Sequence, residues 1–243
     1  MTLPVAILAG GLARRLRPIT DTIPKALVPI AGEPFAYHQL RLLAERGIER
    51  VVYCLGYLGE QVIAAVGDGT RFGLSVQYIL DGPSLLGTAG AIAQALPKLG
   101  ESFFILYGDS YLDCDYWAVE NAFRNSGQPA LMTVFKNEGQ WDVSNVEFDG
   151  RRIVHYSKIA RTDRMRYIDY GLSAVHRGAF EGMPTTEPAD LAALYERLAE
   201  EGRLAAFEVF SRFYEVGSAA GLVEFESYLS GAKRDGIREA TSW

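Results

Sequence analysis

Short apolar runs alternate with helical patterns through the first half of the chain. The run Val5–Ala9 ends at paired glycines, and Arg50–Leu55 is a second run, rich in β-branched residues. Apolar runs of about four to eight residues that end at turn signals are typical of strands buried on both faces. Further strands are expected over 75–80, 103–107 and 130–135.

Apolar residues recur at helical spacing between these runs. Phe35, Leu40 and Leu43 lie on one face of a predicted helix, which Gly47 is expected to end. Similar patterns predict helices over 57–69, 88–96 and 115–125. Pro97 is expected to stop the second of these, because proline cannot continue a helix without losing a hydrogen bond.

The pattern changes after Trp141. Asp149–Gly150 separates two alternating runs, which is a strong local signal for a β-hairpin. The remaining predicted elements are a strand over 167–175, a helix over 188–201, a strand over 203–210 and a helix over 219–229.

This order of elements predicts the α/β class. Strands and helices in regular succession require right-handed crossovers, which build a parallel sheet covered by helices on both faces. We expect a Rossmann-like, mixed but mainly parallel sheet with an antiparallel insertion in the second half. The predicted organisation is a single domain over 1–229 and a loosely packed C-terminal tail over 230–243.

Composition excludes some classes of partner. The chain has 243 residues and a net charge of −6, whereas a sequence-independent nucleic-acid binder needs a basic surface. No apolar run approaches the roughly 18 residues of a membrane span, and no signal peptide is evident. Cys54 and Cys114 are expected to be free thiols. We therefore expect a cytoplasmic protein without a nucleic-acid or membrane partner.

The loop after the first strand carries the first chemical signal. Gly10 and Gly11 let phosphate approach backbone N–H groups closely, and Arg14, Arg15 and Arg17 add positive charge. The loop is neither a G-x-G-x-x-G turn nor a Walker A loop. By itself it is compatible with a basic surface turn or with a site for a polyanion.

A second stretch, which contains Pro24 and Lys25, indicates what the glycine-rich loop binds. "GGLARRLRPIT" followed by "PKALVPIAGEP" resembles the signature of the sugar-1-phosphate nucleotidyltransferases, or NDP-sugar pyrophosphorylases. The compact form is similar to the heptose- and mannose-1-phosphate guanylyltransferases. Ala13 stands where the family has its third glycine. The matching residues are Gly10, Gly11, Arg15, Leu16, Pro18, Thr20, Pro24 and Lys25.

The resemblance extends over about residues 3–229. "LLGTAGAIAQAL", "LYGDS", "YSK" and "FYEVGSAAGLVEFESYL" resemble the family's base-recognition, metal-binding, sugar-phosphate and closing segments. It implies the nucleotide-diphospho-sugar transferase fold. It also implies transfer of a nucleoside monophosphate from an NTP to a sugar 1-phosphate, which gives an NDP-sugar for polysaccharide synthesis and pyrophosphate.

The resemblance assigns roles to residues of this chain. Arg15 and Lys25 are the expected catalytic residues, and Asp109 and Glu215 the expected ligands of Mg²⁺. The expected nucleotide-binding residues are Ala9, Gly10, Gly11, Leu12, Asp81, Gly87, Thr88 and Ala89. The expected sugar-phosphate residues are Asn145, Lys158, Asp169 and Gly171.

The chemistry agrees with these roles. A sugar phosphate has a second pKa of about 6, so it is ionised at neutral pH and needs no general base. Positive charge is needed instead, to bring two polyanions together and to stabilise the departing pyrophosphate. The Asp81 carboxylate can accept from guanine N1 and N2, which favours GTP over UTP and CTP.

Two positions depart from the family pattern and leave alternatives open. Glu215 stands where the family usually has aspartate, and Asn145 where it often has glycine. The acceptor could therefore be a non-sugar phosphate or phosphonate, as in a cytidylyltransferase. A regulatory homologue that binds nucleotide without turnover is a further alternative. A homodimer is left open as the assembly.

Overall fold

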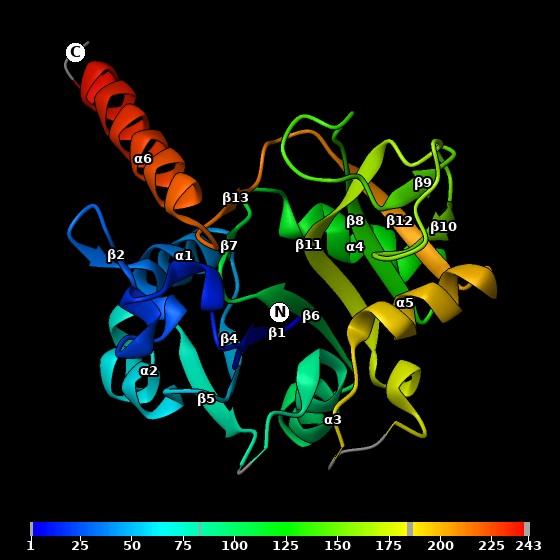
Figure 1. Ribbon diagram of the computed structural model, residues 1–243, viewed down its shortest axis with the longest axis horizontal. Helices are drawn as coiled ribbons and strands as arrows, with labels where there is room; N and C mark the ends of the chain where they lie inside the picture. Colours follow the sequence, from blue (N-terminus) through cyan, green and yellow to red (C-terminus); the bar gives the residue numbers. More distant parts are fainter. Residues whose placement is uncertain (1, 83, 184–186, 241–243) are drawn as a thin grey trace.

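One sheet of nine strands forms the centre of the computed structural model, which describes residues 2–82, 84–183 and 187–240 (Figure 1). Its order is β10-β9-β11-β6-β1-β4-β5, and β8 pairs with both β11 and β12. The strands are β1 (Val5–Ala9), β4 (Arg50–Leu55), β5 (Ser75–Leu80), β6 (Ser102–Tyr107), β8 (Ala130–Lys136), β9 (Val146–Phe148), β10 (Ile153–Tyr156), β11 (Tyr167–His176) and β12 (Leu204–Val209).

The sheet combines a parallel half with a mixed half that is mainly antiparallel, although β12 pairs with β8 in parallel. Strands β5, β4, β1 and β6 are parallel neighbours, with β1 at their centre. Strand β11 runs antiparallel to β6, β8 and β9, and β9 pairs with β10 as the predicted hairpin. The predicted α/β class with an antiparallel insertion is confirmed, and β1, β4 and β5 have the predicted bounds.

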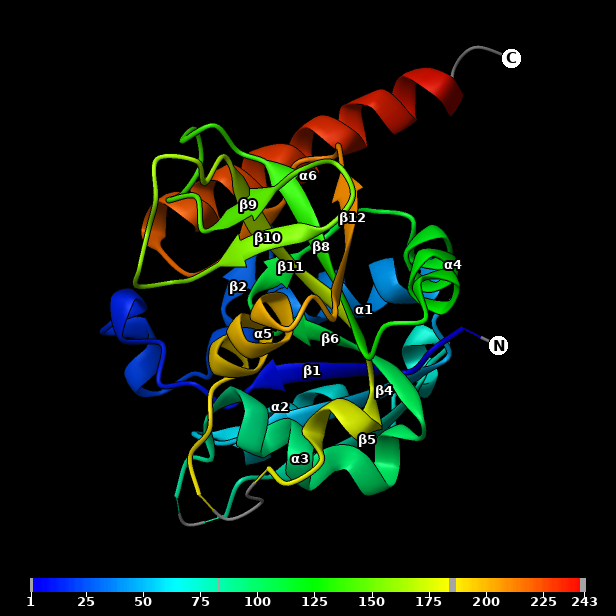
Figure 2. The ribbon, with the colours of Figure 1, turned by 90° about the vertical axis from the view of Figure 1, so that its right-hand side faces the viewer.

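Helices cover both faces of the sheet. Helices α1 (Phe35–Glu45), α2 (Gly59–Val66) and α4 (Tyr116–Ser126) contribute to one hydrophobic cluster, and α3 (Gly87–Leu99) and α5 (Leu191–Glu200) to the other. Figure 2 shows the two layers from the side.

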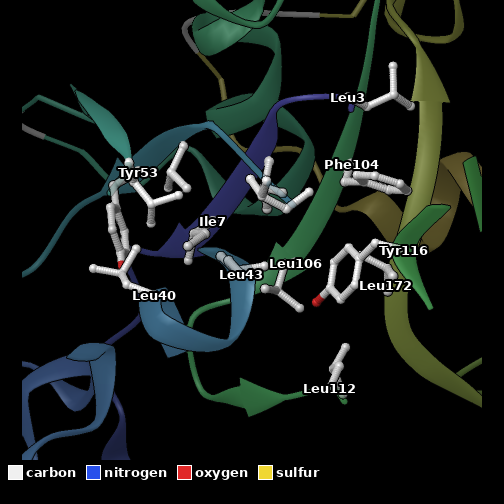
Figure 3. Packing of buried hydrophobic residues seen from close by; sticks show 14 of the residues in the cluster. Leu3, Ile7, Leu40, Leu43, Tyr53, Phe104, Leu106, Leu112, Tyr116 and Leu172 are labelled. Atoms are coloured by element: carbon white, nitrogen blue, oxygen red, sulfur yellow. The ribbon is translucent and has the colours of Figure 1, made fainter. Parts of the chain in front are cut away.

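Successive side chains of β1 point to opposite faces of the sheet, so this strand packs against both helix layers. Val5 and Ile7 lie in the cluster with Leu40 and Leu43 of α1, whereas Ala6 faces the cluster of α3 and α5. Figure 3 shows Leu40 and Leu43 packed near Ile7. Full burial of each such side chain stabilises the fold by about 1.5–3 kcal/mol, so this packing holds the end of β1 in place.

Two short antiparallel ribbons lie outside the main sheet. β2 (Pro29–Ile30) pairs with β3 (Glu33–Pro34), and β7 (Ser110–Tyr111) pairs with β13 (Tyr214–Glu215). The second ribbon places Glu215 opposite Ser110, directly after Asp109. Short 3₁₀ helices occur at Arg14–Leu16, Ile19–Asp21, Lys25–Leu27, Thr70–Phe72 and Arg177–Phe180.

Two predicted helix ends are wrong. Helix α3 continues through Pro97 to Leu99, because a proline in the last turn removes only one hydrogen bond. The last helix, α6, runs over Ala219–Ala240 instead of ending at residue 229. The added segment is rich in residues with high helix propensity, such as alanine, arginine and lysine, which favours continuation.

Helix α6 begins against the body and then leaves it. Leu222 and Phe225 belong to a small aromatic cluster with Phe35 and Val216. The C-terminal half of α6 extends away from the rest of the molecule in both views (Figures 1 and 2). The segment predicted as a loose tail is thus helical as far as Ala240, and its last residues, 241–243, lie outside the described residues. No described helix combines the length and the apolar character that a membrane span requires.

Candidate functional site

A pocket of about 260 Å³ lies at the carboxyl ends of β1, β4, β5 and β6, beside the start of α3. Open α/β sheets bind ligands at this edge. Eight of the predicted site residues line it: Ala9, Gly10, Gly11, Lys25, Asp81, Gly87, Thr88 and Asp109. Residues from five separate segments therefore meet in one cavity.

Gly10 is required by a close approach of two loops. A Cβ at this position would lie 3.0 Å from the backbone nitrogen of Gly56, which follows β4. The carbonyl oxygen of Gly10 accepts from the N–H of Tyr57 at 3.2 Å. The first loop is thereby held against the end of β4, at the rim of the pocket.

Ala13 adopts a backbone conformation that usually needs glycine. Its φ is +47°, in the left-handed region. The hydroxyl of the buried Thr20 donates to the Ala13 carbonyl at 2.9 Å, and the N–H of Leu16 donates to the same oxygen at 3.1 Å. These bonds hold the loop shape although alanine occupies the position of the expected third glycine.

Lys25 and Asp109 form an ion pair at the floor of the site. Lys25 Nζ lies 2.6 Å from Asp109 Oδ2, and each side chain is only 21% exposed. Charge-assisted hydrogen bonds of this length are among the strongest in proteins. The pair joins two residues that the sequence assigns to different tasks, catalysis and metal binding.

Arg15 extends from the first loop toward the same pair. A Cβ on Gly217 would lie 3.0 Å from a terminal guanidinium nitrogen of Arg15 and 3.5 Å from Asp109 Oδ2. Gly217 therefore lies directly against both Arg15 and Asp109, a position that the sequence analysis did not identify. The sequence signal that could have identified Gly217 is its position directly after a strand-like segment.

Glu215 lies beside this cluster on β13. Although solvent reaches its side chain, crowding by protein atoms raises the pKa of Glu215 to about 7, and the charges of Asp109 and Asp142 act in the same direction. The charges of Arg15 and Lys25 lower it. Three carboxylates and two cations thus interact around Glu215.

Gln39 on α1 holds the segment that carries Asp109. The side chain is 1% exposed, and its Nε2 donates to the carbonyl oxygens of Tyr107 at 3.0 Å and of Ser110 at 2.8 Å. These carbonyls flank Asp109 on both sides. In the sequence Gln39 is one polar residue of a helix, and nothing there indicated this function.

Asp81 lies 8% exposed at the far end of the pocket. Its Oδ2 accepts from the N–H of Leu86 at 3.2 Å, whereas its buried Oδ1 has no hydrogen-bond partner among the described residues. Burial raises the pKa of this carboxyl, and the bond from Leu86 acts against that rise. A buried acceptor without a partner is costly, so Oδ1 is suited to accept from a ligand.

The start of α3 is held by the segment before α5. Thr88 Oγ1 donates to Asp190 Oδ1 at 2.8 Å and accepts from the N–H of Leu191 at 2.8 Å. The N–H of Ala89 donates to the carbonyl of Ala189 at 2.8 Å. Ala89 is fully buried and does not line the pocket, and Leu12 also lies outside the lining.

The predicted sugar-phosphate residues form a second group around β11. The N–H of Asp169 donates to Asn145 Oδ1 at 2.9 Å, and Asp169 Oδ1 accepts from the N–H of Gly171 at 3.0 Å. Burial raises the pKa of Asp169, whereas the charge of Lys158 lowers it. Lys158 Nζ lies 5.7 Å from the ring centroid of Tyr107, which lines the pocket. Tyr107 therefore links the two groups.

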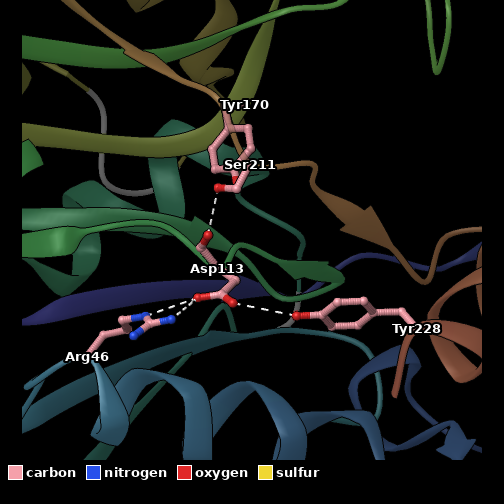
Figure 4. A network of polar contacts seen from close by, with 5 residues as sticks. All are labelled: Arg46, Asp113, Tyr170, Ser211 and Tyr228. Carbon is pink, nitrogen blue, oxygen red and sulfur yellow. Dashed lines mark hydrogen bonds and ion pairs between the residues drawn. The ribbon is translucent and has the colours of Figure 1, made fainter. Parts of the chain in front are cut away.

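A polar network lies behind the β7–β13 ribbon (Figure 4). Asp113 accepts from Arg46 Nε at 3.0 Å and from the Tyr228 hydroxyl at 3.5 Å. Its backbone carbonyl accepts from Ser211 Oγ at 2.7 Å, and Tyr170 contacts the same hydroxyl. This network ties the segments before and after the ribbon to α1 and α6.

The predicted metal ligands are a pair of carboxylates. In the described part of the chain, no group of three or more His, Cys, Asp or Glu side chains has the arrangement of a metal site. Cys54 and Cys114 are both buried free thiols, as expected.

The chain matches the family model described as Nucleotidyl transferase over residues 5–145, more than half of its length. It is 42% identical over 113 residues to an N-acetylmuramate alpha-1-phosphate uridylyltransferase of Neisseria meningitidis serogroup B, covering 46% of this chain and 49% of that protein. It is 28% identical over 214 residues to a UTP–glucose-1-phosphate uridylyltransferase of Synechocystis, covering 81% and 55%. The matches thus span about half the length of these relatives.

Solved structures share the fold. A putative glucose-1-phosphate thymidylyltransferase from Bacillus anthracis superposes with a TM-score of 0.81 at 21% identity, covering 93% of this chain and 94% of that one. HddC from Yersinia pseudotuberculosis, in complex with GMP-PN, gives 0.75 at 23% identity, covering 93% and 99%. Because these identities are below 25%, the similarity to the two structures shows that the fold is shared.

Proposed function

Because the chain belongs to the nucleotidyl transferase family, we propose that it transfers a nucleoside monophosphate from an NTP to a sugar 1-phosphate. The observation that carries the proposal is that Lys25 and Asp109 form an ion pair in the lining of a glycine-rich pocket and that Arg15 lies close to Asp109. Several relatives carry names of sugar-1-phosphate nucleotidyltransferases, which supports this acceptor class.

The proposed reaction is an in-line displacement at the α-phosphorus. An oxygen of the ionised acceptor phosphate forms the new P–O bond, and the bond to the β-phosphate breaks, so that pyrophosphate leaves with its electron pair. Arg15 binds the β- and γ-phosphates with its planar guanidinium, and Lys25 neutralises charge near the α-phosphate. Lys158 binds the acceptor phosphate.

Asp109 and Glu215 fit a Mg²⁺ ion. Burial raises the pKa of Glu215, and the charge of Asp109 adds to that rise, so a cation held by both carboxylates would be favourable for each of them. Mg²⁺ is commonly bound in proteins by one or two carboxylates together with substrate phosphates and water, so two protein ligands are sufficient. When bound, the ion would supply positive charge that stabilises the triphosphate and the leaving group.

Asp81 is the proposed reader of the nucleobase. Asp81 lines the pocket, its buried Oδ1 has no hydrogen-bond partner among the described residues, and guanine offers adjacent N1–H and N2–H donors on one edge. This supports GTP as the donor.

A matrix of substrates tests the proposal. Purified protein is incubated with Mg²⁺, each of four NTPs and each of several sugar 1-phosphates, with phosphocholine and a phosphonate as non-sugar acceptors. The expected result is pyrophosphate release with GTP and at least one sugar 1-phosphate. A clear preference for a non-sugar acceptor, or tight NTP binding without any release, would contradict the proposal.

A further inference from the structure

Arg212 contacts the distant Trp141 as well as two residues that follow it in the sequence, Tyr214 and Glu224. Its guanidinium carbon is 3.5 Å from the ring centroid of Trp141 and 4.8 Å from that of Tyr214. Its terminal nitrogen forms an ion pair with Glu224 Oε2 at 2.7 Å. Arg212 thus joins the loop before β9, strand β13 and helix α6.

The loop on one side of Arg212 is internally ordered. Residues 137–144, here called the Trp141 loop, surround the fully buried side chain of Asn137. Asn137 Oδ1 accepts from the N–H of Trp141 at 3.1 Å, and Nδ2 donates to the Asp142 carbonyl at 2.5 Å and to Ser144 Oγ at 3.1 Å. The loop therefore behaves as one rigid unit, because the side-chain amide of Asn137 binds residues at its middle and at its end.

This loop leads into the acceptor side of the site. Asn145, which directly follows it, accepts from the backbone of Asp169. The charge of Asp142 is close enough to act on Glu215 of β13. The Trp141 loop therefore lies between the predicted sugar-phosphate residue Asn145 and the surroundings of Glu215.

Arg212 makes two contacts with aromatic rings and one ion pair with a carboxylate. Its Nε is buried and has no hydrogen-bond partner among the described residues, a cost that the two aromatic faces and Glu224 must offset. The planar guanidinium stacks on aromatic rings, which a lysine ammonium cannot do in the same way.

We propose that Arg212 is a positioning residue that holds the Trp141 loop against β13 and thereby fixes the wall of the acceptor subsite. The catalytic part of this proposal rests on the proposed function. Arg212 itself is not among the described residues that line the nucleotide pocket. Its loss should therefore affect the acceptor and leave the binding of NTP unchanged.

Arg71 provides a matched control. Its guanidinium carbon lies 4.1 Å and 4.6 Å from the ring centroids of Tyr37 and Phe72, so it makes the same kind of contact far from β13 in the sequence and outside the pocket lining. In Arg212→Met, the KM for the sugar 1-phosphate is expected to rise about tenfold. This factor corresponds to the free energy of one buried cation–π contact. The Kd for the NTP should change less than about twofold, and Arg71→Met should change neither constant.

Fluorescence tests the loop without turnover. In a Trp117→Phe/Trp243→Phe background, Trp141 is the only tryptophan. Arg212→Met should raise the acrylamide quenching constant of Trp141 about twofold, because one ring face becomes free. Arg212→Lys, which keeps the charge beside Glu224, should resemble Arg212→Met.

The outcomes separate the two proposals. An unchanged quenching constant in Arg212→Met, or an NTP Kd that weakens as much as the acceptor KM, would overturn the role of Arg212. Absence of pyrophosphate release in the wild-type protein would overturn the proposed function alone, and the quenching result would still decide on the loop.

Discussion

The proposed nucleotide side and the proposed acceptor side of the site are built in different ways. The nucleotide pocket consists of loops that directly follow parallel strands, and glycines such as Gly10 let those loops approach one another. The acceptor side depends on side chains from remote segments, with Arg212 between the Trp141 loop and β13. Backbone therefore shapes the first region and side-chain contacts shape the second.

Asp109 stands where the two regions meet, and its substitution is expected to have the largest effect. Asp109→Asn removes the partner of Lys25 and one proposed metal ligand, so pyrophosphate release should fall about a thousandfold, equivalent to about 4 kcal/mol. Steady-state pyrophosphate release measures this. Asp149→Asn, in the exposed hairpin turn, is the control; comparable rates for both variants would refute the role of Asp109.

Asp81→Asn should affect the nucleotide side alone. The amide replaces one acceptor oxygen by an NH2 donor and removes the negative charge, so kcat/KM for GTP should fall about tenfold to a hundredfold, with a smaller loss for UTP. The acceptor KM should stay constant. Competition between GTP and UTP in one reaction measures the preference, and an unaltered GTP:UTP ratio would remove Asp81 from base recognition.

Gln39→Leu should weaken metal binding with little change in nucleobase preference. The variant loses two hydrogen bonds to the carbonyls that flank Asp109, and the segment is then free to shift. The Mg²⁺ concentration for half-maximal activity should rise about tenfold. Thermal unfolding serves as the control measurement: a loss of stability without any change in the Mg²⁺ requirement would mean that Gln39 only supports the fold.

Glu215 should make stability depend on pH. Its pKa is about 7 in the folded protein and 4.5 ordinarily, so between these values the folded state holds a proton that the unfolded chain has released. Stability should therefore fall as pH rises across this interval, by about 1 kcal/mol because solvent screens the group. Urea unfolding without divalent cations measures this, and Glu215→Gln should flatten the curve. An equal slope in both proteins would contradict the assignment.

Ala13→Gly is expected to have the smallest effect. Relief of the left-handed conformation slightly exceeds the greater entropy of glycine in the unfolded chain, so stability should rise by about 0.5 kcal/mol. Chemical denaturation measures the change. Destabilisation by a similar amount would mean that the hydrogen bonds from Thr20 and Leu16 have already removed the strain.

The same contrast explains what could be predicted from the sequence. Strands β1, β4 and β5 are apolar and end at glycine or aspartate, so both their bounds and the residues after them could be located. The β7–β13 ribbon has two residues in each strand, too few for any periodicity, and its pairing joins distant parts of the chain. The positions of Gln39, Gly217 and Arg212 follow from tertiary contacts, which local patterns do not contain.

The arrangement of β8 in the sheet has a consequence for synthesis. Both of its neighbours, β11 and β12, come later in the chain. On the ribosome, both edges of β8 therefore stay unpaired until β11 has emerged as far as His176, and one edge stays unpaired until β12 has emerged as far as Val209. Unpaired strand edges invite pairing with other chains, so slow translation between Lys136 and Val209 would expose nascent protein to aggregation and make it a client for chaperones.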